Sequence, residues 1–193
     1  GPVSFAASAS ELLVTAGSSL FSYNGTNLAT VTFPDTASVR AVTYHDGLFI
    51  ATRDSTQRYY WSSVNDGRTW NALDFASAER FPDNLLDLAI LNDTLWLFGE
   101  DSIEPNANTG DADAPYQRFE QRIFEKGMKA TGCLSRLDNS LYFVGSDSMA
   151  YRLAEVPERI SDHGIEERLD ASASVSTFAY TFEGHSFLCV PLD

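Results

Sequence analysis

The sequence predicts an all-β chain, folded as a β-propeller-like array of four-stranded blades with one inserted helix. Short apolar runs alternate with turns rich in Gly, Asn, Asp and Ser along the whole chain. Four hairpin turns are each followed by an aromatic residue, and these aromatics recur at intervals of 47, 46 and 45 residues: Phe49, Trp96, Tyr142 and Phe187. Repeats of about 40–50 residues that each hold a strong hairpin are typical of propeller blades.

The clearest hairpin lies in the middle of the chain. Two apolar runs, Leu85–Leu91 and Thr94–Gly99, flank the pair Asn92-Asp93, and these two residue types tolerate the left-handed backbone of tight hairpin turns. Both faces of each run are apolar, which predicts that the hairpin is buried on both sides.

The same pattern divides the chain into blades. They are expected near residues 3–33, 39–75, 85–123 and 131–170, with half a blade at residues 175–193. A propeller is built from whole blades, so we interpret the chain as a single domain that is truncated at both ends and belongs to a larger propeller. The start Gly1-Pro2 resembles the scar of tag cleavage, so localisation is not inferred from it.

Several turn residues are expected to have structural roles. The segment Ser63–Trp70 reads SVNDGRTW and resembles the Asp-box turn of propeller blades, with Asn65 in place of the usual Asp. Asn65, Asp66 and Gly67 would shape that turn while Trp70 folds over it. The other residues assigned to turns are Asn92, Asp93, Asp138, Asn139, Glu183, Gly184 and His185.

Two segments stand out from the strand pattern. Val156–Asp170 carries Ile160, Ile165 and Leu169 among charged residues, which predicts the inserted helix. Pro105–Asp113 is polar and predicts a loop exposed on the surface. Both segments are expected to contact neighbouring subunits.

Charge and composition narrow the function. The 193 residues carry a formal net charge of −14, which is unfavourable for gripping phosphates. Solubility is the first explanation of this charge, and the alternative is a passage through which DNA slides without binding. The apolar runs are too short to span a bilayer, so no membrane partner is expected. Cys133 and Cys189 have no C-x-x-C spacing, and we expect buried free thiols, with a bridge between them left open.

No constellation of residues predicts an enzyme. His45, His163 and His185 are scattered, and neither a P-loop nor a G-x-S-x-G motif occurs, so we assign no catalytic, cofactor-binding or metal-ligating residue. The alternative is a glycan-binding or sialidase-like propeller, suggested by the Asp-box turn. Its nearest candidate residues are Arg40, Arg53, Arg58, Tyr59 and Asp46.

Three stretches together resemble one family, the packaged-DNA stabilisation or tail-hub proteins of short-tailed phages. The first is Leu95–Glu104, with a Phe-Gly and then an Ile-Glu, followed by Phe124–Gly127 and Cys133. The second is Arg159–Glu166, in which Asp162 replaces the family's usual Thr. The third is Phe178–Phe187, which is similar to a Phe-x-Tyr-x-x-Glu-Gly-His-x-Phe hairpin.

The resemblance implies a structural virion protein without catalytic residues or cofactor. Such proteins form a homo-oligomeric ring, commonly of six copies, below the portal and adaptor proteins. The ring closes the head, retains the packaged DNA and carries tail spikes, fibres or a needle. The expected location is therefore the phage tail, reached after assembly in the host cytoplasm.

Overall fold

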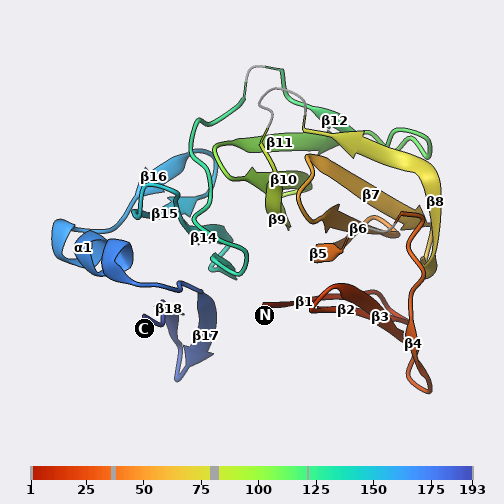
Figure 1. Ribbon diagram of the computed structural model, residues 1–193, viewed down its shortest axis with the longest axis horizontal. Coiled ribbons are helices and arrows are strands. Elements are labelled where there is room, and N and C mark those ends of the chain that lie inside the picture. The colour runs from red at the N-terminus through yellow and green to blue at the C-terminus, as the bar shows by residue number, and fades with distance from the viewer. Residues whose placement is uncertain (1, 36–37, 79–82, 121, 193) are drawn as a thin grey trace.

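The computed structural model describes residues 2–35, 38–78, 83–120 and 122–192. Within them the chain forms five antiparallel sheets placed around a common centre, together with one helix (Figure 1). The prediction of an all-β, propeller-like fold with one inserted helix is confirmed.

The first two sheets each contain four strands in sequence order. The first is made of β1 (Val3–Ala7), β2 (Leu12–Ala16), β3 (Ser19–Tyr23) and β4 (Leu28–Thr30). The second is made of β5 (Val39–His45), β6 (Leu48–Arg53), β7 (Arg58–Ser63) and β8 (Asp66–Ser77).

The next two sheets repeat this order, and a hairpin follows them. The third sheet is made of β9 (Leu85–Leu91), β10 (Thr94–Gly99), β11 (Ile103–Asn108) and β12 (Tyr116–Arg118). The fourth is made of β13 (Leu134–Leu137), β14 (Ser140–Val144), β15 (Ala150–Leu153) and β16 (Pro157–Arg159). The helix α1 (His163–Ala171) leads to the two-stranded sheet β17 (Phe178–Phe182) and β18 (His185–Cys189).

Successive sheets face one another, and the core consists of apolar layers between them. Sheets one and two enclose a layer that includes Leu13 and Phe49. Ile50 and Leu95 belong to the layer between sheets two and three. Phe98 and its neighbours form the layer between sheets three and four, where the Phe98 and Phe143 rings meet edge to face with centroids 5.4 Å apart. The first strands β1, β5 and β9 pack side by side nearest the centre.

The structural repeat is set by the hairpin turns rather than by the aromatics. The turns after β5, β9, β13 and β17 each contain two residues with φ between 46° and 82°, and their first residues lie 46, 46 and 45 positions apart: Asp46, Asn92, Asp138 and Glu183. Phe49 comes three residues after the first residue of its turn, Asp46, whereas Trp96 comes four residues after Asn92. Phe49 therefore packs toward the preceding sheet, whereas Trp96 packs toward the following one. Assigning Phe49 to the aromatic series was wrong.

The predicted helix at Val156–Asp170 was wrong in its first half. β16 (Pro157–Arg159) pairs there with β15, and α1 begins only at His163. Asp162 is the N-cap, because its carboxylate accepts a 2.9 Å hydrogen bond from the N–H of Ile165 and thereby satisfies a free donor of the first turn. Leu169 is buried in the core, as an amphipathic helix requires, whereas Ile160 and Ile165 are exposed.

The predicted loop Pro105–Asp113 is also partly wrong. Its first four residues belong to β11, which pairs with β10 and β12. Pro105 lies opposite Trp96 and is buried. The last strand of this blade, β12, has only three residues and ends at Arg118.

The turn Asp138-Asn139 offers a test of the repeat. Asn139 is exposed with φ 57°, a conformation that glycine adopts freely and a β-branched residue resists. We expect Asn139→Val to lower the free energy of unfolding by about 1–2 kcal/mol, and Asn139→Gly to leave it unchanged or raise it slightly. Urea unfolding measures both variants, and equal stabilities of the Val and Gly variants would contradict the left-handed turn.

Candidate interaction surfaces

The hairpin turns lie at one rim of the propeller, and two of them link neighbouring sheets. At the end of β5, His45 hydrogen bonds through Nδ1 to the Tyr116 hydroxyl at 2.9 Å. Its Nε2 lies 2.9 Å from an Asp93 carboxylate oxygen. Farther along the rim, the Ser186 hydroxyl donates to Asp138 at 2.9 Å and ties the last hairpin to sheet four. The turns thus join adjacent sheets where the apolar layers end.

The Asp-box-like turn is shaped mainly by Asp66. Its carboxylate accepts bonds from the Thr69 hydroxyl at 2.7 Å and the Arg68 N–H at 2.9 Å, and these bonds lower the pKa of Asp66. Asn65 has φ 54° and accepts a 2.9 Å bond from the Tyr44 hydroxyl. The Trp70 indole N–H donates to the Gly67 carbonyl at 2.8 Å, so the ring lies over the turn.

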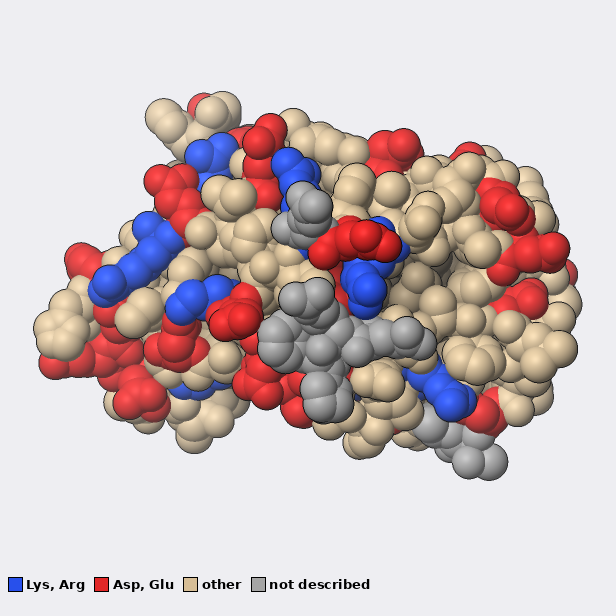
Figure 2. Space-filling model, turned by 90° about the horizontal axis from the view of Figure 1, so that it is seen from above, with Lys and Arg blue, Asp and Glu red and all other residues tan. Residues whose placement is uncertain are grey.

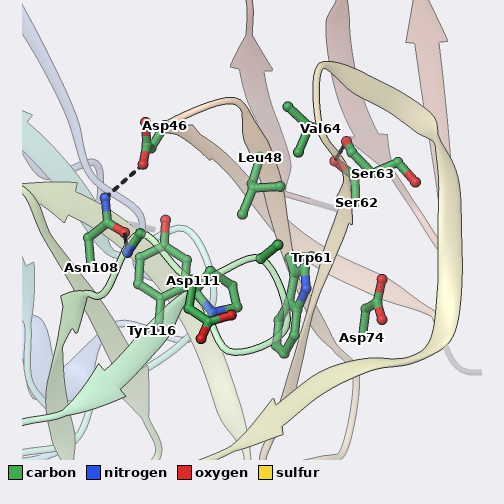
Figure 3. Close-up of a pocket in the computed structure, with 13 residues that line it drawn as sticks. Asp46, Leu48, Trp61, Ser62, Ser63, Val64, Asp74, Asn108, Asp111 and Tyr116 are labelled. Carbon is green, nitrogen blue, oxygen red and sulfur yellow. Dashed lines mark hydrogen bonds between the residues drawn. The ribbon is translucent and has the colours of Figure 1, made fainter.

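A small pocket opens between sheets two and three beside these turns (Figure 3). Its volume is about 210 Å³, and its walls come from the β5–β6 turn, the β7–β8 turn, β8, and the loop between β11 and β12. The Trp61 and Tyr116 rings and Leu48 form the apolar wall, and the carboxylates of Asp74 and Asp111 lie at its sides (Figure 3). A 3.0 Å hydrogen bond from Asn108 to Asp46 closes one edge.

The side chains that line this pocket carry negative charge. Among the described residues, three aspartates line it, Asp46, Asp74 and Asp111, and no Lys or Arg does. Burial and the Asp46 and Asp93 carboxylates raise the pKa of Tyr116, so its phenol remains neutral. The Trp61 side chain is 5% exposed, and its indole N–H has no hydrogen-bond partner among the described residues. The pocket therefore combines carboxylates, aromatic rings and one unsatisfied donor.

A larger cavity of about 760 Å³ occupies the centre, between β1, β5, β9 and β13. Its lining is mixed rather than acidic: among the described residues that line it, Asp87 is the acidic one and Arg136 the basic one. The Arg136 guanidinium donates to the Ile90 carbonyl at 3.3 Å. Burial raises the pKa of Asp87 to about 6, although the backbone N–H groups of Leu88 and Gly132 oppose the shift. The propeller's own centre thus lacks the acidic lining expected of a DNA-repelling wall.

Charged side chains are numerous on the outer face shown in Figure 2. Seen from above, acidic and basic side chains mix on the left, and acidic ones predominate toward the right-hand end (Figure 2). On the face shown in Figure 2, carboxylates therefore contribute much of the charged surface.

The last hairpin exposes an aromatic face. The rings of Phe178, Tyr180 and Phe187 stack in a row, with centroids 6.3 Å and 5.1 Å apart. All three are at least 41% exposed. Glu183 and Gly184 form the turn with φ 49° and 79°, and His185 follows it with its ring beside Phe187. These three exposed rings form one contiguous apolar surface on the hairpin.

The residues considered for a sialidase-like site have separate structural roles. Arg40 pairs with Asp54, and Arg53 is 1% exposed, pairs with Asp35 and lies over the Phe33 ring. Arg58 lies over Phe75, and Tyr59 is buried in the core, while Asp46 reaches the pocket of Figure 3. The structure does not present the three arginines as one cluster.

The described cysteines and histidines form neither a disulfide nor a metal site. Both cysteines are free thiols, with Cys133 buried and Cys189 half-buried, and burial raises the pKa of Cys133 to about 11. Over the described ranges, no three His, Cys, Asp or Glu side chains are grouped to hold a metal ion. No described helix is long and apolar enough to cross a bilayer.

The sequence did not reveal the pocket between sheets two and three. The sequence points to Asp46 only for a sialidase-like site, and it gives no signal for a pocket at Trp61, Asp74, Asp111 or Tyr116. These residues come from separate segments of two blades, and no spacing motif connects them. Only the structural repeat, which places their turns at one rim, could have brought them together.

Solved structures with the same architecture are β-propellers. Among the similar chains are YCF48 from Cyanidioschyzon merolae, with TM-score 0.58 and 8% identity, and the β-propeller domain of Cps50 (Swd1) from Myceliophteria thermophila, with 0.57 and 10%. A chain of the Mitotic Checkpoint Complex gives 0.59 and 14%. The YCF48 match covers 95% of this chain and 64% of YCF48. The Cps50 match covers 80% of this chain and 56% of that chain, and the match to the Mitotic Checkpoint Complex chain covers 82% and 50%.

These similarities define the chain as a β-propeller and say nothing more about its activity. No curated protein matches its sequence significantly. A family model described as "Bacteriophage P22 Gp10, beta-propeller" matches residues 1–193. The chain therefore belongs to this phage stabilisation family, which confirms the resemblance drawn from its motifs and identifies it as a phage structural protein of the virion.

Asp87 makes stability depend on pH. A carboxyl whose folded pKa is raised from 3.8 to about 6 contributes stability that is fully present below pH 3.8 and is lost as pH rises through about 6. Asp87→Asn removes this titration, so we expect it to raise the free energy of unfolding at pH 8 by at most about 3 kcal/mol, with no gain near pH 3.8.

Urea unfolding at several pH values measures this difference. Asp113→Asn is the matched control, because Asp113 is exposed and its removal changes the net charge equally. A gain for Asp87→Asn that is the same at every pH, or a loss at pH 8, would contradict the assignment.

Proposed function

We propose that the chain is a structural component of the phage tail hub. In this role, copies of the propeller form a ring, a hexamer by resemblance, below the portal and adaptor proteins. The ring closes the channel, retains the packaged DNA and provides attachment for tail spikes, fibres or a needle. The observation that carries the proposal is the match of the entire chain to the P22 Gp10 propeller family.

The physical properties of the chain support this role. A net charge of −14 disfavours binding to the DNA backbone, so a ring built from such subunits would let DNA pass without holding it. The central cavity is lined by both an acidic and a basic residue, so the surface that repels DNA would be an outer one, such as the face of Figure 2 that carries carboxylates. The exposed aromatic row of the last hairpin supplies apolar surface of the kind used in assembly.

The sialidase-like alternative receives no such support. A sialic acid carboxylate requires clustered cationic donors, and the candidate arginines are paired or buried separately. We therefore propose no catalytic residue.

Virion assembly without the chain tests the proposed role. We expect particles from phage lacking the corresponding gene to package DNA and then lose it. Density-gradient sedimentation and electron microscopy would show empty heads without tail appendages, and the wild-type gene supplied in trans should restore filled particles. Particles that retain DNA and carry complete tails without this protein would contradict the proposal.

DNA binding by the purified chain gives an independent test. The acidic outer surface predicts no retardation of duplex DNA in a gel, even at about 50 mM salt where phosphate contacts are strong. Retardation that weakens steeply with added salt would show that the chain grips the phosphate backbone, contrary to the proposed passage of DNA.

A further inference from the structure

The pocket of Figure 3 combines three aspartates with an apolar wall. We propose that it receives a basic side chain, arginine or lysine, presented by a peptide segment of another protein. This inference goes beyond the tail-hub role and rests on the pocket's residues alone.

The charge of the pocket selects the ligand. Asp46, Asp74 and Asp111 surround it, and no Lys or Arg among the residues that line it neutralises them. Carboxylates around one concave site attract a cation and repel phosphates, nucleotides and acidic sugars. The ligand therefore carries positive charge.

The spacing of the carboxylates excludes a bare metal ion. Three acidic side chains that bind one ion must converge on a single point, and no such group exists within the part of the chain that the structure describes. An extended organic cation instead spreads its donors over several carboxylates. A guanidinium offers five N–H donors in a plane and can therefore bond more than one acceptor at once.

The apolar wall suits the rest of such a side chain. Leu48 and the rings of Trp61 and Tyr116 lie between the carboxylates (Figure 3). Arginine and lysine bury their aliphatic stems against apolar surface while the charged head stays with polar groups, and both cations interact favourably with aromatic rings. A volume of about 210 Å³ suits one side chain rather than a drug-sized molecule.

The unsatisfied donor of Trp61 indicates a peptide. The side chain is 5% exposed, its N–H has no partner, and in Figure 3 the nitrogen lies on the side of the ring that faces Asp74. A buried donor without an acceptor is costly, and a ligand carbonyl that reaches the nitrogen as neighbouring side chains adjust would remove that cost. A peptide offers such a carbonyl next to its basic side chain, whereas a free polyamine does not.

The pocket is held in shape before a ligand arrives. Thr109 donates its N–H to the Pro115 carbonyl at 2.9 Å and its hydroxyl to the Ala114 carbonyl at 2.6 Å, which closes the loop between β11 and β12. The Asn108–Asp46 bond then fixes this loop to the neighbouring blade. Such preorganisation lowers the entropy lost on binding.

A matched pair of peptides tests the proposal by NMR on the full 193-residue chain. The probes are acetyl-Gly-Arg-Gly-amide and the same peptide with citrulline, which is the neutral isostere of arginine. The Trp61 indole N–H resonance is assigned by its loss in Trp61→Phe. We expect the arginine peptide to shift this resonance saturably. The citrulline peptide should bind more weakly by a factor of about ten or more.

Variants separate the pocket's charge from the chain's total charge. Asp74→Asn combined with Asp111→Asn should weaken binding of the arginine peptide about tenfold. Asp113→Asn combined with Glu120→Gln removes the same charge at two exposed residues outside the pocket, and should leave binding within about twofold. Unchanged folding of each variant is verified from its amide spectrum.

Three results would overturn the proposal. The first is equal binding of both peptides. The second is an absence of any shift at Trp61 with the arginine peptide. The third is a shift at Trp61 produced by a neutral sugar such as methyl glucoside but not by the arginine peptide, which would assign the pocket to carbohydrate.

Discussion

Face-to-face packing of successive sheets is the interaction on which the rest of the structure depends. Each inner sheet lies between two others, so both of its faces must be apolar, and all six residues of β6 are accordingly buried. Ile50 and Phe49 are adjacent in sequence yet belong to two different apolar layers. Burial at about 25 cal/mol per Å² makes these layers the main source of stability. The acidic pocket between sheets two and three accordingly lies beside turns at the rim, where these layers end.

How much the sequence predicts depends on whether local and tertiary preferences agree. The strands Leu85–Leu91 and Thr94–Gly99 were predicted to the residue, because the apolar runs and the left-handed turn Asn92-Asp93 specify the same hairpin. The helix prediction failed where the local and the tertiary preferences disagree. Its predicted first turn is taken by β16, which completes sheet four, and the Asp162 cap fixes the true start. Pro105 predicted a loop, yet the residue lies buried within β11.

The sites were harder to predict than the strands because they form between blades. Trp61 and Tyr116 meet only after sheets two and three have packed, and the sequence carries no motif at their separation. The raised pKa of Asp87 likewise comes from burial at the centre, which no local pattern indicates. The family motifs, by contrast, were recognisable because they are contiguous. A propeller with a stable layered core and variable rims is a suitable scaffold for a virion protein, since partners can be recognised at the rims without disturbing the core.

Native-state hydrogen exchange tests most directly the claim that inter-sheet layers hold the four blades together as one unit. The amides of β6, β10 and β14 should exchange only through global unfolding, with one common free energy that falls in parallel as urea is added. Those of β17 and β18, whose aromatic face is exposed, should exchange earlier by local opening. Distinct free energies for β6, β10 and β14 that stay separate at all urea concentrations would show that the blades unfold independently, contradicting this account.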